Sequence, residues 1–508
     1  MPCLSSTAPV RATLVLAFVA CVAAAAFGQA TLEDQFGLRS TLTPSSKTRS
    51  ASSRMTFGSP PGAGAGDTGF VSTNAPPAGA KQTKSTSKAK QSEAAALASA
   101  AAKLAARVRG TPDDDVTGTV PRPAPRRLEE EEPFGPVGVR VGSFDVKSSA
   151  ELSAGYDDNP FRTAGGRGSR FTMVAAKVET KSNWSRHELA SELRGAFTDY
   201  LQVSGNDRPE AEAKLRGRID VTSVSRIELE GRAALTTEAA GSPDSVTSAK
   251  RPPNVYTFAG TAGYVHRFNR LELGLRGTVE RSAYQDAKLI SGGVEDLSDR
   301  DYISYGTALR GSYEVTPGIK PFIEAGVDRR VYDLETDSSG VMRDSNGMTA
   351  RAGVEFAREG ILTGEASAGY ARRHYRDPTL DDVSGLIFDA SLVWKATALT
   401  RVTLKANSEI GETTLAGASG VFTHQASVAI DHAFRRWLIG SASVSYGIED
   451  YRGAGRRDDR LGLSASLTYY FNRYAALKGE VRREQLNSNV PGQDYTANIV
   501  LVGLRLQR

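Results

Sequence analysis

The stretch that decides the fold lies near the C-terminus, where residues 461–469 read LGLSASLTY. Every odd-numbered position in it is apolar, and every even-numbered position carries glycine, serine or threonine. Successive side chains of a β-strand point to opposite faces of its sheet, so this alternation predicts a strand with one apolar and one polar face. Residues 271–280 (LELGLRGTVE) and 226–233 (RIELEGRA) show the same pattern.

The same pattern fills the chain from about residue 143 to its end, in about eighteen segments of about 12–15 residues. Short connections, at 183–186, 223–226, 269–270, 316–319, 358–361, 396–400, 435–436 and 472–473, alternate with longer ones, at 157–168, 201–210, 239–254, 285–300, 335–346, 377–384, 413–420, 452–458 and 487–493. Outer-membrane barrels have an even number of strands, short periplasmic turns and longer outer loops. We therefore predict an all-β chain whose residues 143–508 form a transmembrane antiparallel up-and-down β-barrel of about 18 strands (16–18), with both termini inside.

The alternative fold is a soluble β-sandwich or β-helix. Soluble strands usually have about 5–6 residues, whereas a tilted crossing of the hydrocarbon layer takes about 9–11 residues plus the interface. The segments have the longer length. Aromatic residues near the segment ends also predict the two interfacial girdles of a membrane barrel: Tyr156, Tyr200, Tyr284, Tyr332, Tyr375 and Tyr451 on the loop side, and Phe144, Phe268, Trp394, Phe434, Trp437 and Phe471 on the turn side.

The composition is compatible with this fold. The 508 residues are 40% hydrophobic and 24% charged, with a net charge of +5 and a mean hydropathy of −0.33. Strands that face lipid on one side and water on the other average to such a neutral hydropathy. After the N-terminal region there is no run of about 20 apolar residues, which excludes a membrane-spanning helix there.

The N-terminus predicts export through a cleaved signal peptide, residues 1–30, with Arg11 before an apolar stretch at 13–27. Both cysteines, Cys3 and Cys21, lie within it, so the mature chain would have no disulfide, thiolate metal site or catalytic cysteine. A lipoprotein signal that ends at Cys21 is the alternative interpretation. Localisation in the outer membrane of a Gram-negative cell follows from the signal and the barrel together.

Residues 31–142 are rich in Ser, Ala, Pro and Lys and predict a disordered periplasmic arm, because they bury too little apolar area to offset their ordering entropy. Residues 91–109 are alanine-rich and predict a short helix within the arm. The arm is interpreted either as a basic tether that touches peptidoglycan or anionic lipid, or as an unstructured leader.

Alternation also predicts which charged side chains face the lumen, because a charge facing lipid costs about 2–4 kcal/mol at the midplane. The lumen-lining candidates are Arg194, Arg216, Arg218, Arg232, Arg276, Glu280, Arg310, Glu324, Asp328, Arg330, Arg351 and Glu355. A barrel of this size has room for an aqueous channel. These charges either form opposed rings that set ion preference or pair between strands and support the wall. One of the loops 285–300 and 239–254 is long enough to fold inward as a constriction.

The sequence offers little chemistry, and we predict no catalytic, cofactor or metal site. Of the five histidines, only His374, near Asp377 and Asp381, lies at the predicted rim. The carboxylates of 157–159 and 377–382 lack the glycine-bounded spacing of a calcium loop, although divalent cations there would bridge lipopolysaccharide. Arginine pairs such as Arg372-Arg373 would contact lipopolysaccharide phosphates. Basic groups are dispersed along the strands, which argues against nucleic acid as a partner.

The first predicted strand and its loop, residues 151–162 (ELSAGYDDNPFR), resemble the opening of the putative β-barrel porin 2 family, whose members carry a Gly-Tyr-Asp-x-Asn element there. Tyr156, Asp157 and Asn159 match that element, and the resemblance covers about residues 143–508. It implies a porin-like outer-membrane barrel, and some relatives are associated with exopolysaccharide production and export. The chain ends without a terminal aromatic residue, so Leu506 would serve in recognition by the barrel-assembly machinery.

Three functions are compatible with these observations. The first is a water-filled channel for passive passage of ions or small hydrophilic solutes, without a chemical step. The second is an outer-membrane conduit for exopolysaccharide secretion, in which the arm docks export partners. The third is a non-conducting structural or surface-interaction barrel. A charge-rich lumen with few inward aromatic residues favours the first.

Overall fold

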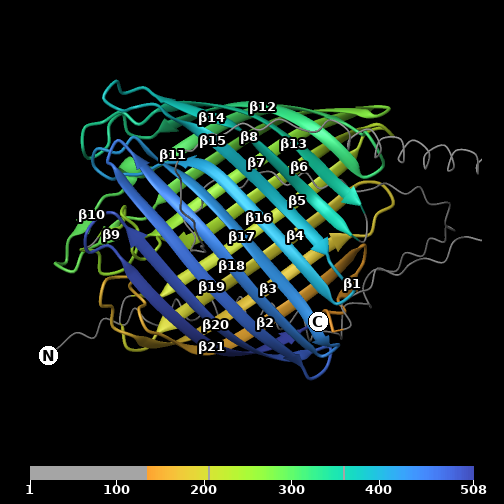
Figure 1. Cartoon of the computed structure of the whole chain (residues 1–508), viewed down its shortest axis with the longest axis horizontal. Helices are drawn as coiled ribbons and strands as arrows, with labels where there is room; N and C mark the ends of the chain where they lie inside the picture. The colour runs from red at the N-terminus through yellow and green to blue at the C-terminus, as the bar shows by residue number, and fades with distance from the viewer. Residues whose placement is uncertain (1–133, 204–205, 247, 359–360) are drawn as a thin grey trace, which may run out of the picture. The chain divides into compact units, whose positions relative to one another are not determined.

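The computed structural model describes residues 134–203, 206–246, 248–358 and 361–508. Eighteen long strands form a closed antiparallel barrel, which confirms the predicted fold (Figure 1). Each strand pairs with the next one along the chain, and the last strand pairs with the first from Ser149–Gln507 to Asp157–Ile499. The predicted signal peptide and the predicted helix at 91–109 lie outside the described residues.

The wall strands follow one another without crossover. They are β2 (Phe144–Asp157), β3 (Ser169–Ser182), β4 (Glu188–Tyr200), β5 (Arg208–Asp220), β6 (Ser225–Thr237), β7 (Asn254–Phe268), β8 (Leu271–Tyr284), β11 (Tyr302–Tyr313), β12 (Ile319–Tyr332), β13 (Ser345–Arg358), β14 (Leu362–Tyr375), β15 (Val383–Lys395), β16 (Thr400–Gly411), β17 (Gly420–Arg435), β18 (Leu438–Arg452), β19 (Arg456–Tyr470), β20 (Ala475–Ser488) and β21 (Tyr495–Gln507).

Three short elements and one 3-10 helix complete the described structure. β9 (Ala287–Lys288), β10 (Val294–Glu295) and η1 (Ser298–Arg300) lie in the loop between β8 and β11. β1 (Val139–Val141) pairs with the start of β2, although its residues belong to the predicted arm. Phe134, just before β1, stacks on Tyr470 with ring centroids 5.6 Å apart. The described segment therefore begins before the predicted barrel boundary at residue 143. Among the described residues, no helix is long and apolar enough to cross a membrane.

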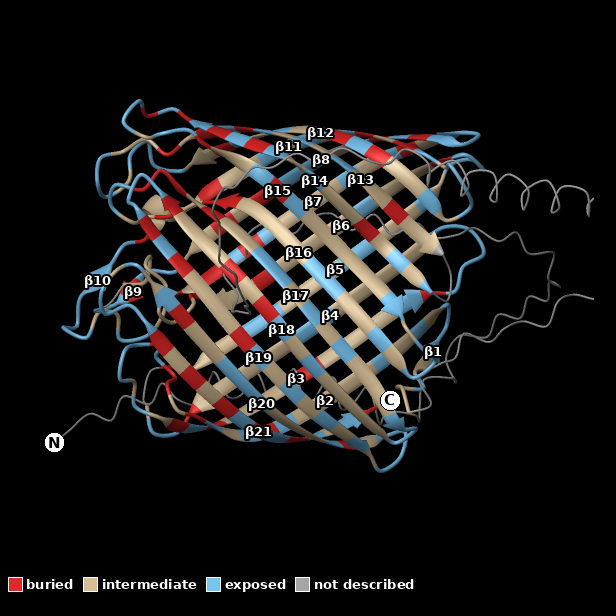
Figure 2. Cartoon of the chain, viewed as in Figure 1, coloured by how far each residue is buried: buried red, intermediate tan, exposed pale blue. Residues whose placement is uncertain are grey.

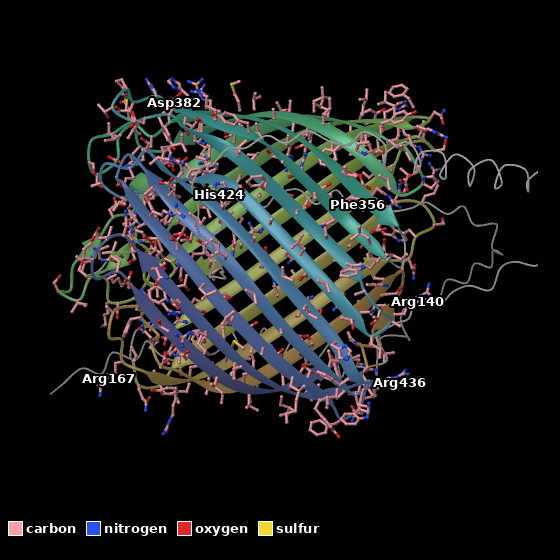
Figure 3. The ribbon with its side chains drawn as sticks, viewed as in Figure 1. Arg140, Arg167, Phe356, Asp382, His424 and Arg436 are labelled. Atoms are coloured by element: carbon pink, nitrogen blue, oxygen red, sulfur yellow. The ribbon has the colours of Figure 1, made fainter. Side chains whose placement is uncertain are left out.

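The connections gather by length at the two ends of the barrel, which we call the loop end and the turn end. Arg167 and Asp382, from long connections, lie at the loop end, and Arg436, from a short one, lies at the turn end (Figure 3). Buried residues gather toward the loop end (Figure 2). The long connections therefore pack against one another there.

Strand alternation separates an apolar outer face from a polar inner face. On β8, Leu271, Leu273 and Leu275 are exposed, whereas Glu272 and Glu280 between and beyond them are buried. Exposed leucines on one face of a wall strand are stable only against lipid, because in water each would forgo its burial energy of about 1.5–3 kcal/mol. The outer face is therefore the lipid face.

The predicted loop-side aromatic girdle is wrong in five of its six members. Tyr200, Tyr375 and Tyr451 are buried, because alternation turns them to the inner face. Tyr284 and Tyr332 also belong to the inner-face class of their strands. Tyr200, for example, donates a hydrogen bond to Asp157 Oδ2 over 3.2 Å. The exposed aromatic residues of the outer face near the loop end include Tyr156, which was predicted, together with Tyr256, Tyr305, Tyr370 and Phe388.

Candidate functional site

The inner wall carries all twelve predicted lumen residues. Each belongs to the alternation class opposite to the exposed apolar residues of its strand. All of them except Glu280 form an ion pair within 4.0 Å with another described residue. The charges therefore pair along the wall, as one of the two predicted arrangements requires.

On β4 to β6 the ion pairs are partly exposed, and three of them share Glu212. Its carboxylate contacts Arg194 of β4, Lys214 Nζ at 3.1 Å and Arg232 Nε at 2.7 Å. The arginine side chain of the first pair is 52% exposed, whereas that of Glu212 is 11% exposed. In the Arg194 pair the cation therefore faces the lumen solvent, and the anion lies against the wall.

On β8 to β14 the ion pairs are buried. Arg310 on β11, with a side chain only 3% exposed, donates to Glu365 Oε2 on β14 over 2.8 Å. Its guanidinium also lies 3.5 Å from the ring centroid of Phe322. Glu324 on β12 accepts from Arg276 over 3.1 Å and from Arg351 over 2.7 Å. Charges taken out of water require such partners, so this cluster depends on each of its members.

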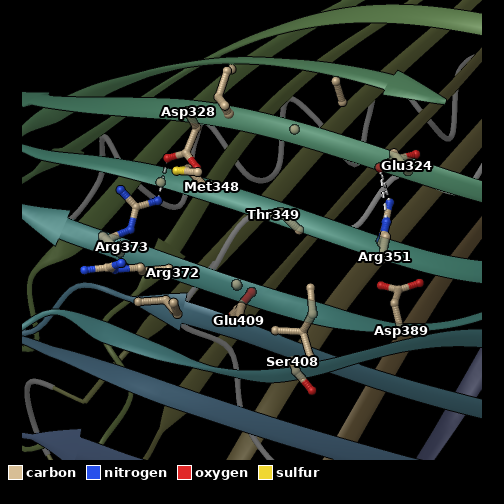
Figure 4. A pocket seen from close by; sticks show the side chains of 18 of the residues that line it. Glu324, Asp328, Met348, Thr349, Arg351, Arg372, Arg373, Asp389, Ser408 and Glu409 are labelled. Carbon is tan, nitrogen blue, oxygen red and sulfur yellow. Dashed lines mark hydrogen bonds and ion pairs between the residues drawn. The ribbon is translucent and has the colours of Figure 1, made fainter.

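A cavity of about 330 Å³ lies on the inner wall between β8 and β16 (Figure 4). Figure 4 shows two charge pairs along it, Glu324 with Arg351 and Asp328 with Arg373. Asp389 and Glu409 lie at its other side. The lining therefore offers both signs of charge to a small polar molecule.

Two loops meet across the loop end of the barrel. Residues 238–253 join β6 to β7, and residues 412–419 join β16 to β17, with eight wall strands between them on one side and ten on the other. Asp244 Oδ1 accepts hydrogen bonds from Thr413 Oγ1 (2.7 Å), Thr414 N (2.8 Å) and Thr414 Oγ1 (3.2 Å). We call this contact the latch.

Three arginines hold the latch from the surrounding wall and loops. Arg300 donates to the carbonyl oxygen of Asp244 over 2.9 Å. Arg343 donates to the carbonyl oxygen of Thr413 over 2.6 Å, and Arg330 pairs with Glu412. Both loops that the sequence offers as a constriction take part in this contact, the one between β6 and β7 through Asp244 and the one between β8 and β11 through Arg300. No sequence pattern marks the loop at 412–419, because a short loop of mainly small residues has no periodicity of its own.

The latch loop contains a carboxyl group whose ionisation is sensitive to pH. Burial raises the pKa of Glu238 to about 7, against the opposing effect of Arg300 Nη1 at 3.2 Å, and with a contribution from the nearby carboxylate of Asp244. A raised pKa stabilises the folded loop below the ordinary carboxyl pKa, and this stability is lost as the pH rises through about 7.

We therefore expect the latch to open more often at pH 8 than at pH 5. The measurement is the open probability of single channels across this range, for the wild type and for Glu238→Gln. The glutamine variant should show a flat profile, because it keeps the size of the side chain and removes the titrating group. A rise of equal size in both proteins would assign the pH dependence to another group.

The residues of the family-like element fasten the loop after β2. Asp157 Oδ1 accepts from the backbone N–H of Asn159 over 2.9 Å, and Oδ2 contacts Arg162 Nη1 at 2.8 Å. Asn159 Nδ2 in turn donates to a backbone carbonyl of β21 over 3.1 Å. Tyr156 is exposed on the outer face. The element thus fastens this loop to β21, where the barrel closes, and the polar atoms of Asp157 and Asn159 bind other groups of the protein.

The other predicted polar sites are occupied by protein contacts as well. Asp158 accepts from Asn498 N and Nδ2, and Asp377 accepts from Thr379. His374 Nδ1 lies 2.7 Å from Asp382, which also binds Arg372. Within the described ranges, no group of three or more His, Cys, Asp or Glu side chains is arranged to hold a metal ion.

The family model described as putative beta-barrel porin 2 matches residues 132–508. The chain belongs to this family. It is a porin-like barrel of the outer membrane, and the match begins close to the first described residue. No curated protein matches this porin-like chain.

The porin-like chain is also similar to solved structures at low TM-scores. OccAB4 of Acinetobacter baumannii is 13% identical over 72% of this chain and 98% of its own, with a TM-score of 0.37. OccK2 (OpdF) of Pseudomonas aeruginosa is 12% identical over 72% and 98%, with a TM-score of 0.38. The siderophore receptor PiuA of Acinetobacter baumannii is 10% identical over 73% and 82%, also at 0.38. The family match alone therefore carries the assignment.

Proposed function

We propose that this barrel is a passive channel for ions and small hydrophilic solutes, with its loop end outside the cell and its passage narrowed there by the latch. The observation that carries the proposal is the inner face, which presents paired charges along the wall from strand to strand while the outer face is apolar. Such a lining keeps water in the lumen, and hydrated solutes need no chemical step to pass.

The exposure of the paired charges favours anions. Arg194 is far more exposed than its partner Glu212, and on β20 Arg482 is 42% exposed against 11% for Glu480. Arg505 of β21 and Glu151 of β2, which pair where the barrel closes, show the same order, with side chains 32% and 11% exposed. At these three pairs a passing ion meets the cationic group first, and the less exposed carboxylates act on it less strongly because they are already paired.

The latch limits the size of the solute. The two loops join through Asp244, so a polymer would have to separate them before it entered. This geometry favours small solutes over a continuously threaded polysaccharide.

The test is single-channel recording of the purified protein in a planar bilayer, with reversal potentials in a chloride gradient. We expect discrete open steps and a preference for chloride over potassium. Cation preference would contradict the exposure argument. Silence from a correctly folded sample would overturn the channel itself and would favour polysaccharide secretion or a non-conducting barrel.

A further inference from the structure

The backbone ladder between β15 and β16 is incomplete toward the loop end. It runs from Lys395–Arg401 to Asp389–Asn407 and stops there. Residues 383–388 of β15 and 408–411 of β16, all within the described ranges, lie beyond it. On either side the ladders continue, to Arg373–Val383 between β14 and β15 and to Gly411–Val421 between β16 and β17. We call the unpaired stretch the seam.

The ends of β16 and β17 at the seam lie inside the barrel wall. Ile410 and Phe422 share their alternation class with Leu404 and Val428, which are exposed on the outer face. Both are nevertheless buried, and they form one cluster with inner-face residues of β14 and β15, namely Ala371, Tyr375, Val383 and Ile387. The tip of this hairpin therefore overlaps the inner face of β15.

Apolar side chains close the seam where the ladder is missing. Phe422, only 2% exposed, lies directly against Gly385 of β15, where a Cβ atom would collide with its ring. In the described part of the chain, one hydrogen bond joins the unpaired stretches, from Phe388 N to Ser408 Oγ over 3.0 Å. Separating the two segments would therefore break van der Waals contacts and that bond, but not a ladder of backbone hydrogen bonds.

The seam separates two different environments. Inside it lies the cavity of about 330 Å³, which Ile387, Asp389, Ser408 and Glu409 line together with the charged residues of β12 and β13. Outside it, Leu386 and Phe388 are exposed on the lipid face. A molecule that crosses here needs an apolar part for the lipid and the cluster, and a polar part for the charged cavity.

We propose that the seam is a lateral passage, through which a single-chain amphiphile moves between the cavity and the membrane with its polar head in the cavity and its tail against the apolar cluster. The passage is separate from axial conduction of small solutes. Phe422 is the side chain that must move, because its ring lies nearest to the glycine position of β15 that leaves space for it.

The test is a covalent cross-link between the two sides of the seam. The full chain carries Gly385→Cys and Phe422→Cys, and its own Cys3 and Cys21 are replaced by alanine. A short, reducible cross-linker then joins the two introduced thiols. The matched control, Ser427→Cys with Ser445→Cys, joins directly opposed residues of the intact β17–β18 ladder. The probe is photoreactive palmitate, and the labelled residues are mapped by mass spectrometry.

We expect palmitate to label the wild type at β14 to β17 around the seam. Cross-linking across the seam should abolish this labelling and reduction should restore it, whereas the control cross-link should leave it in place. Equal labelling before and after reduction, labelling spread over the whole outer face, or no labelling would each overturn the proposal. Because ion conductance is recorded separately, none of these outcomes decides the axial channel.

Discussion

Arg310→Ala is expected to lower the free energy of unfolding of the barrel by about 3–5 kcal/mol, the typical cost of removing one partner from a buried ion pair. The guanidinium of Arg310 lies within 4.0 Å of the carboxylates of Glu324, Glu355 and Glu365. Glu324 and Glu355 keep other cationic partners after the substitution. Glu365, whose side chain is 1% exposed, is left buried without its hydrogen-bonded arginine.

The measurement is urea unfolding of the protein in lipid vesicles, and the matched control is Arg194→Ala. Both arginines lie on the inner wall and pair with a glutamate, but Arg194 is half-exposed, and exposed pairs contribute about 0–1 kcal/mol. Adding Glu365→Gln to Arg310→Ala should recover part of the loss, because the stranded charge is removed. Equal losses for the two arginine variants would show that burial does not set the strength of these pairs.

The strands and their connections were accessible from the sequence because both depend on local chemistry. Alternation is a property of neighbouring residues, and the predicted short connection at 269–270 lies between Phe268 of β7 and Leu271 of β8. Asn269 there has φ = 55°, a left-handed conformation that asparagine tolerates better than other non-glycine residues. Gly318 at the predicted turn 316–319 has φ = 85°, which glycine adopts without steric cost.

The contacts inside the loop end could not be predicted from local sequence patterns. Distance from the loops predicts which tyrosines lie near the interface, whereas the face on which each lies depends on the alternation class of its strand. The latch joins Asp244 to Thr413, residues 169 positions apart. The break in the β15–β16 ladder leaves no trace in the local pattern either, because β16 and β17 keep their register with each other throughout.

Asp244→Ala is expected to raise the open probability of single channels by about tenfold or more, because hydrogen bonds to a charged group contribute about 1.5–3 kcal/mol each and about 1.4 kcal/mol changes an equilibrium tenfold. One carboxylate oxygen, Oδ1, accepts all three bonds from Thr413 and Thr414. Their loss removes the direct link between the two loops, while Arg300 and Arg343 still hold each loop by its backbone.

Two further variants separate the latch from the charge of the loop. Asp286→Ala removes the same charge from an exposed position in the loop between β8 and β11, so it should leave the open probability unchanged. Asp244→Asn keeps an acceptor oxygen but loses the charge, and it should give an intermediate value, since neutral hydrogen bonds are about half as strong. If Asp286→Ala opened the channel as much as Asp244→Ala, the effect would be one of loop charge, and the contact between the two loops would not be what narrows the passage.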